Sequence, residues 1–166
     1  MSYVGVETVQ ILRYRSAPGE WTYASLGMSR HPMTGAAANV ISVDGPRAEL
    51  ILRVRELTDP TGDVWRRLAL LAVAPAVEGV VYVAGMTIDV GEPLVPGSSC
   101  TGAVLAESRF ADVSTARGAV SVLEALPATA NELAWSRIHG ADALRARWAE
   151  HRVDPSDLSR TSVSLD

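Results

Sequence analysis

Apolar and polar residues alternate most regularly between Arg47 and Arg55. Ala48, Leu50, Leu52 and Val54 share one side of an extended chain and charged residues occupy the other, with Ile51 as the exception. This period of two predicts a strand with one buried face.

Turn residues divide the rest of the first half into shorter strands. Ala17-Pro18-Gly19 separates Thr8–Tyr14 from Trp21–Leu26, and this arrangement predicts a hairpin. Asp44-Gly45-Pro46 is a second turn, so we expect Asn39–Val43 to pair with the strand that follows it.

A helix is predicted next, because Val64, Leu68, Leu71 and Pro75 recur at helical spacing. Asp63 is suited to be its N-cap, and Pro75 is expected to mark its end. The apolar stripe is broad, which favours a helix that lies flat on a sheet.

The segment Val80–Ala84 is apolar throughout and rich in β-branched residues, which predicts a central strand covered on both faces. Met86, Ile88 and Val90 continue one face until a loop at 91–99, rich in glycine and proline. Two further strands are expected at Ala103–Phe110 and Ala119–Leu126, joined across 112–118.

After Pro127 the pattern becomes helical. Thr129-Ala130-Asn131-Glu132 has the form of a capping box, and Gly140 suits a left-handed position at the end of the helix. A second helix from Ala141 would place Leu144 and Trp148 on one face and end before Asp154-Pro155. The residues after it form a polar tail that either docks or frays.

These elements predict an α+β fold with a mixed, mainly antiparallel sheet, packed by one central helix and a C-terminal helical pair. The length of 166 residues fits a single domain over 1–166. We expect its core to span about residues 8–153 and its polar tail residues 154–166.

Charge and composition exclude several functions. The net charge is −4, and all fifteen basic residues are arginine, so no lysine can form a Schiff base, anchor pyridoxal phosphate or serve a phosphate loop. The calculated pI near 5.4 gives no reason to expect nucleic-acid or membrane binding. No motif for a cofactor is present, and we predict none.

The residues that could hold a metal or form a disulfide are few. His31, His139, His151 and Cys100 show no zinc-ligand spacing, so no metal site is expected. A single cysteine fits a reducing cytoplasm, and the longest wholly apolar run is far shorter than a membrane-spanning helix.

Gly27-Met28-Ser29-Arg30-His31 partly matches the nucleophile elbow of hydrolases, in which a serine sits on a tight turn. His31 occupies the position where the elbow requires glycine, and Pro32 cannot continue a helix. A small serine hydrolase using Ser29 and His31 is therefore the alternative function, and we predict no catalytic residue for the favoured one.

The same segment is the strongest candidate for a binding surface. It combines aromatic, methionine and arginine side chains, which are enriched in protein interfaces, although large aromatics are more often part of a core. The candidate partner-binding residues are Trp21, Tyr23, Met28, Ser29, Arg30, His31 and Met33.

The run from Trp21 to Met33 resembles the signature of the suppressor of fused family, particularly its bacterial single-domain members. The resemblance extends through 47–52, 65–75, 126–132 and 138–144, and covers about residues 20–160. It implies an α+β fold without known catalytic residues.

Family members in animals sequester transcription factors by binding a peptide, and bacterial members are often proposed to be immunity proteins. The resemblance therefore implies a non-enzymatic protein-binding domain, with neutralisation of a toxin domain by steric binding as the leading hypothesis. A partner strand could also add to an exposed edge of the sheet. A homo-oligomeric structural protein, with contacts from apolar strand faces and Trp148, is a further alternative.

Overall fold

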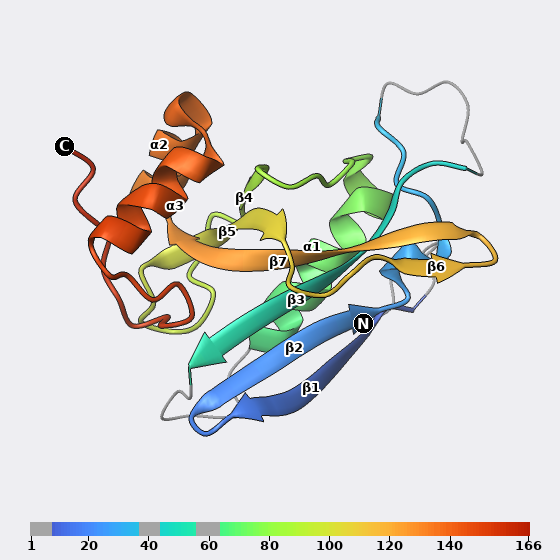
Figure 1. Cartoon of the computed structure of the whole chain (residues 1–166), viewed down its shortest axis with the longest axis horizontal. Helices are drawn as coiled ribbons and strands as arrows, with labels where there is room; N and C mark the ends of the chain where they lie inside the picture. Colours follow the sequence, from blue (N-terminus) through green and yellow to red (C-terminus); the bar gives the residue numbers. More distant parts are fainter. Residues whose placement is uncertain (1–7, 37–43, 56–63) are drawn as a thin grey trace.

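The computed structural model describes residues 8–36, 44–55 and 64–166. The described residues form one sheet, a short 3-10 helix (η1) and three α-helices (Figure 1). In chain order the elements are β1 (Gln10–Ala17), β2 (Glu20–Leu26), η1 (Met28–Arg30), β3 (Arg47–Arg55), α1 (Val64–Glu78), β4 (Thr87–Asp89), β5 (Cys100–Glu107), β6 (Val113–Thr115), β7 (Gly118–Thr129), α2 (Ala130–His139) and α3 (Ala141–Glu150).

The strands form a single sheet in the order β1-β2-β3-β7-β5-β4, and β6 also pairs with β7. β3 and β7 are parallel, with Arg47 to Ile51 opposite Val120 to Glu124, and the other pairs are antiparallel. The prediction of a mixed, mainly antiparallel sheet in an α+β fold is confirmed.

Helices cover the two faces of the sheet at different places. Neighbouring residues of β5 point to opposite faces, and Leu105 belongs to the core beneath α1 while Val104 belongs to the core beneath α2 and α3. Figure 1 shows α1 behind the sheet and the α2–α3 pair at one end of it. The central helix and the C-terminal helical pair therefore enclose separate cores.

Most of the predicted elements exist. The first hairpin joins β1 to β2, the strand at 47–55 has its predicted bounds, and Leu144 and Trp148 of α3 are both buried. Thr129 and Glu132 make the predicted capping box. Gly140 has a positive φ of 92°, but its ψ of 155° lies outside the left-handed helical region. The proposed strand at 39–43 and the N-cap Asp63 lie outside the described residues.

Two predictions about the middle of the chain are wrong. Residues 80–84 form no strand, and α1 continues past Pro75 to Glu78. Proline has no backbone N–H and cannot bond the carbonyl of Leu71, four residues earlier. The buried Tyr82 hydroxyl donates to that carbonyl instead, at 2.9 Å. The Tyr82 side chain thus supplies the hydrogen-bond donor that the helix lacks at Pro75. It also attaches residues 80–84, which were expected to form a strand, to the helix.

The backbone of this segment also binds outside the sheet. The Ala36 N–H donates to the Gly79 carbonyl at 2.7 Å, and the Tyr82 N–H lies 3.4 Å from the Met33 sulfur. β-branched composition favours a strand, but these partners hold residues 79–82 against α1 and the 31–36 segment. The central strands are β3 and β7 instead.

Several boundaries differ from the prediction. β5 begins at Cys100 and ends at Glu107, and β7 continues through Pro127 to Thr129. The connection expected at 112–118 contains β6, which pairs with β7. The second C-terminal helix, α3, ends at Glu150, before Asp154-Pro155 as predicted.

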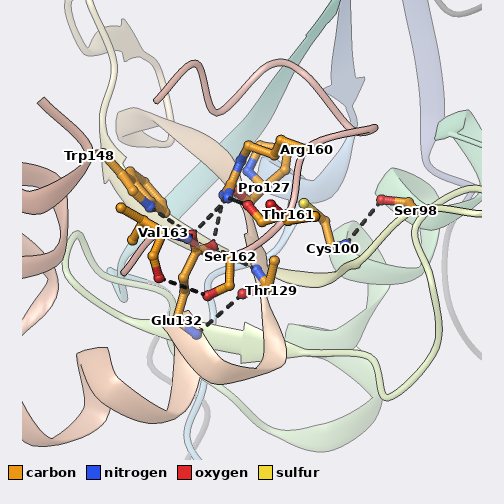
Figure 2. A network of polar contacts seen from close by, with 10 residues as sticks. All are labelled: Ser98, Cys100, Pro127, Thr129, Glu132, Trp148, Arg160, Thr161, Ser162 and Val163. Atoms are coloured by element: carbon orange, nitrogen blue, oxygen red, sulfur yellow. Dashed lines mark hydrogen bonds and ion pairs between the residues drawn. The ribbon is translucent and has the colours of Figure 1, made fainter. Parts of the chain in front are cut away.

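The C-terminal segment 154–166 docks on the molecule. Leu158 is completely buried, and Arg160 forms a bidentate ion pair with the fully buried Glu132 at 2.7 and 2.8 Å. The same carboxylate accepts hydrogen bonds from the backbone amides of Thr129 and Val163 and from the Trp148 indole (Figure 2). Glu132 therefore joins α2, α3 and the tail at one point.

This network sets the ionisation of Glu132. Burial by itself would raise the pKa of the carboxyl, but the hydrogen bonds from Arg160 and the two amides outweigh it and lower the pKa. A carboxylate with a lowered pKa in the folded state stabilises the fold above its ordinary pKa, and this stabilisation is lost as the pH falls.

We predict that Glu132→Gln lowers the free energy of unfolding at neutral pH by about 3 to 5 kcal/mol, because Arg160 stays buried without its partner charge. Urea denaturation measured from pH 7 to pH 3 also shows a smaller loss on acidification in the variant. Glu150→Gln, at an exposed ion pair with Arg147, is the matched control. Equal effects of the two substitutions would contradict this role of Glu132.

We also predict that Tyr82→Phe reduces the free energy of unfolding by about 1 to 3 kcal/mol, since it leaves the Leu71 carbonyl buried without a donor. Tyr14→Phe, which removes a hydroxyl from an exposed tyrosine, should have almost no effect. If both variants unfold at the same urea concentration, Tyr82 does not compensate for Pro75.

Candidate functional site

The predicted binding segment forms a tight turn organised by Glu49 of β3. One carboxylate oxygen of Glu49 accepts from the backbone amides of Gly27 and Ser29, at 2.9 and 3.0 Å, and from the Ser29 hydroxyl at 2.7 Å. The other oxygen accepts from the Ser25 hydroxyl. Gly27 adopts a φ of 110°, which favours glycine. The turn is therefore fixed by a side chain twenty residues downstream.

The position of Ser29 bears on the hydrolase alternative. A hydroxyl has one proton to donate, and in the structure Ser29 donates it to Glu49. A serine nucleophile of the proposed kind would instead donate to His31. The arrangement thus gives Ser29 a role in holding the turn.

Arg47, two residues before Glu49 on β3, holds the outer side of the same turn. Its guanidinium donates to the carbonyls of Ser29 and Arg30 at 2.9 and 2.8 Å, and to the carbonyl of Arg117 at 3.0 Å. Arg117 belongs to the turn between β6 and β7. Arg47 is only 7% exposed, so a nearly buried cation connects the η1 turn to this hairpin.

The structure divides the seven candidate binding residues into two groups. Tyr23, Met28 and Met33 are buried in the main core, and Trp21 packs against it, half-buried, with Arg13 and Arg15 over its ring. The members at the surface of the turn are the partly exposed Ser29 and the exposed Arg30 and His31.

A groove that the sequence did not predict lies between α1 and residues 80–90. It has a volume of about 450 Å³ and a mostly apolar lining. α1 contributes residues that include Leu70, Ala74 and Val77, and the opposite wall includes Val80, Met86 and Ile88. Tyr82 lines the groove and is bonded to the Leu71 carbonyl, so the two walls are fixed relative to each other.

Strand β4 runs along this groove and is the last strand in the sheet order. Met86 accepts a hydrogen bond from Leu105, and Val90 donates to Thr101, so these two residues bond toward β5. Because bonding directions alternate along an antiparallel strand, the backbone N–H and C=O groups of Thr87 and Asp89 point away from β5. No strand among the described residues pairs with this edge.

Sequence reasoning missed the groove because it placed residues 80–84 inside the sheet. The alternation of Met86, Ile88 and Val90 was visible, but it predicts a strand face and not that the strand lies at an edge. The information about the edge is in the sheet order, which depends on pairing between β5 and β7.

The remaining surface contains exposed apolar side chains on β1 and β2. Leu12, Tyr14 and Leu26 are 43 to 49% exposed on the face opposite α1. Trp148, which the homo-oligomer alternative also required, is only 3% exposed and donates to Glu132. That alternative is therefore limited to the strand faces.

No group of three or more His, Cys, Asp or Glu side chains in the described parts of the chain could hold a metal ion. Cys100 is fully buried, and burial raises the pKa of its thiol, so it has the character of a structural cysteine. Within residues 8–36, 44–55 and 64–166, every helix is too short or too polar to cross a bilayer.

Comparison with known protein families identifies the family of this chain. The family model described as suppressor of fused protein (SUFU) matches residues 5–161, almost the whole chain. The chain belongs to the suppressor of fused family. None of the curated proteins compared with it matches by sequence.

Three solved structures have the same fold as this SUFU-family chain. A SUFU homologue of Neisseria gonorrhoeae is 19% identical, with a TM-score of 0.68 over 95% of this chain and 79% of that one. A chain of the Sufu–Fu complex is 14% identical, with a TM-score of 0.68 over 93% and 76%. Drosophila Suppressor of Fused is 15% identical, with a TM-score of 0.69 over 93%, and this chain spans 42% of it. At these identities the likeness concerns the fold.

We predict that Glu49→Gln lowers the free energy of unfolding by about 1.5 to 3 kcal/mol, because an amide accepts fewer hydrogen bonds than the carboxylate and carries no charge. Glu107→Gln at the exposed end of β5 makes the same chemical change without these donors and should have little effect. Urea denaturation of both variants measures the difference. Unaltered stability of the Glu49 variant would exclude Glu49 as the organiser of the turn.

Proposed function

We propose that this chain is a non-enzymatic protein-binding domain that holds an extended segment of a partner protein in the groove between α1 and β4. The observation that carries the proposal is the open edge of β4 beside an apolar groove. A segment added to a sheet edge gains affinity from backbone hydrogen bonds and specificity from pockets for alternate side chains. This groove combines an open strand edge for the hydrogen bonds with an apolar lining for the side chains.

The backbone of β4 would provide the hydrogen bonds. Thr87 and Asp89 offer two N–H and two C=O groups in the plane of the sheet. Every second side chain of a bound segment would point toward the apolar residues of α1, including Ala74 and Val77. The groove is already formed, because the hydrogen bond of Tyr82 fixes its two walls relative to each other. Binding would therefore lose little conformational entropy of this chain.

Membership of the SUFU family supports a protein-binding role. A structural neighbour is the crystal structure of the Sufu–Fu complex. That complex supports only the general role, the binding of another protein. The proposed binding surface rests on the geometry of this chain.

For the biological role, we propose an immunity protein that neutralises a toxin domain in the cytoplasm by covering its surface. The mechanism would be steric, since no catalytic group is required of the chain. Its net charge of −4 would favour association with a basic toxin domain, because complementary charge accelerates encounter. The exposed residues of the turn, Ser29, Arg30 and His31, are proposed as additional contacts.

The two alternatives have less support. A serine hydrolase would require Ser29 to turn from Glu49 toward His31. A homo-oligomer is supported only by the exposed side chains on β1 and β2, and no described segment of this chain covers them.

We predict that linear peptides selected from a phage-displayed library against the whole chain bind at least about tenfold more weakly to Val77→Glu, because a carboxylate in the apolar groove must lose its hydration. Val77 is 56% exposed and lines the groove, so the variant should fold. Val113→Glu is the matched control, since Val113 is 52% exposed on β6, outside the groove.

Titration of the selected peptides by fluorescence anisotropy measures both variants. Equal losses in the two variants, or none in either, would reject the groove as the binding surface. The immunity role is tested by sequencing the genes beside that of this protein and by co-expressing the chain with a toxin domain that one of them encodes; absence of any such gene counts against the role. Protection of the cells by the native chain and by Val113→Glu, but not by Val77→Glu, is the expected result. Killing in the presence of the native chain would contradict it.

A further inference from the structure

The end of α1 carries a negative charge that its own helix does not balance. Glu78 is the last residue of α1, and the last turn contains no basic side chain. The carboxylate is exposed and has no hydrogen-bond or ion-pair partner within residues 8–36, 44–55 and 64–166. Because the carbonyl end of a helix is itself partly negative, a carboxylate placed there is repelled.

This charge belongs to the groove between α1 and β4. Glu78 lines the groove next to Val77, and none of the described residues in the lining is basic. Burial, together with the charge of Glu78, raises the pKa of the Tyr82 hydroxyl, which joins the two walls of the groove. The other acidic residue of the lining, Asp89, lies 3.9 Å from a guanidinium nitrogen of Arg137 in α2 and is partly balanced by it.

The opposite end of the groove is electrically balanced. Arg67, near the start of α1, pairs with Glu92 at 3.0 Å, just beyond Val90 of the lining. This ion pair places residue 92 beside the start of the helix, whereas residue 79 directly follows its end. The chain from 79 to 92 therefore runs back along α1, and Thr87 is the end of β4 nearer to Glu78. One end of the groove is thus negative and the other is neutral.

The length of the groove sets the length of the segment that it can hold. From Leu70 to Glu78 the helix rises about 12 Å, at about 1.5 Å per residue. An extended chain covers that distance in about four residues, and every second side chain points to the same side.

We propose that the groove binds a segment of about four residues with alternating apolar side chains and one lysine or arginine at the end nearer to Thr87, its cation against Glu78 and the carbonyl end of α1. The proposal rests on the proposed protein-binding function and names the chemistry of the partner segment. A cation at this position relieves the repulsion between Glu78 and the helix end, and this gain exists only in the complex. The single negative end also gives the bound segment one direction.

The test uses peptides selected from a phage-displayed library against the whole native chain and titrated by fluorescence anisotropy. Glu78→Gln keeps the shape of the side chain and removes its charge. Glu107→Gln is the matched control, because Glu107 is also an exposed carboxylate at the end of an element and lies outside the groove. Circular dichroism melts establish that both variants are folded.

We expect the selected peptides to carry a lysine or arginine at one end of an alternating apolar run. Their Kd should rise about fivefold in Glu78→Gln and less than about 1.5-fold in Glu107→Gln. Replacing the basic residue of the peptide by glutamine should cause the same loss on the native chain and no further loss on Glu78→Gln, because the two groups act as a pair. Selected peptides without a basic residue, or losses that simply add, would overturn the proposal.

Val77→Asn separates this proposal from the proposed function, since it removes an apolar contact without changing the charge beside Glu78. If peptide binding depends on Val77 but not on Glu78, the groove remains and only the preference for a basic residue is refuted. If it depends on neither residue, the proposed function itself fails. Dependence on Glu78 without dependence on Val77 would keep the cation contact and reject the apolar contacts of the groove.

Discussion

The hydrogen bond from Tyr82 to the Leu71 carbonyl decides the shape of the surface on which the functional account depends. Pro75 leaves that carbonyl without a donor from α1, and a buried carbonyl without a partner is costly. Tyr82 is held against the helix to supply the bond, and residues 80–84 therefore form no strand. The chain bonds to β5 again from Gly85 and Met86, and continues as the short edge strand β4. The groove is the space that remains between the helix and this strand.

A second constraint acts at the start of β3. Arg47 and Glu49 lie two residues apart on the strand and bind the same turn. Arg47 donates to backbone carbonyls of the turn, and Glu49 accepts from backbone amides of the turn and from the Ser29 hydroxyl. A cation therefore holds the carbonyls of the turn, and an anion holds its amides. These bonds fix the backbone of a turn in which Ser29, Arg30 and His31 lie at the surface while Met28 is buried in the core.

The sequence predicted those features whose causes are local. The capping box of Thr129 and Glu132 and the first hairpin depend on residues within a few positions of each other, and both were found where expected. The end of α1 at Pro75 was predicted wrongly, because the donor that rescues Leu71 comes from Tyr82, eleven residues away. The role of Ser29 was hidden for the same reason, since its partner Glu49 lies twenty residues away on β3. The groove could not be predicted, because the position of β4 at an edge depends on the pairing of β5 with β7.

The central claim is that β4 accepts a partner segment through the backbone of Thr87 and Asp89. Amide hydrogen exchange of the whole chain, measured by NMR with and without a saturating library-selected peptide, tests this claim most directly. The account predicts that the amides of Thr87 and Asp89 exchange more slowly with the peptide than without it. The amides of β1 should exchange at the same rate in both cases. Slowed exchange along β1, with the β4 amides as fast as before, would contradict it.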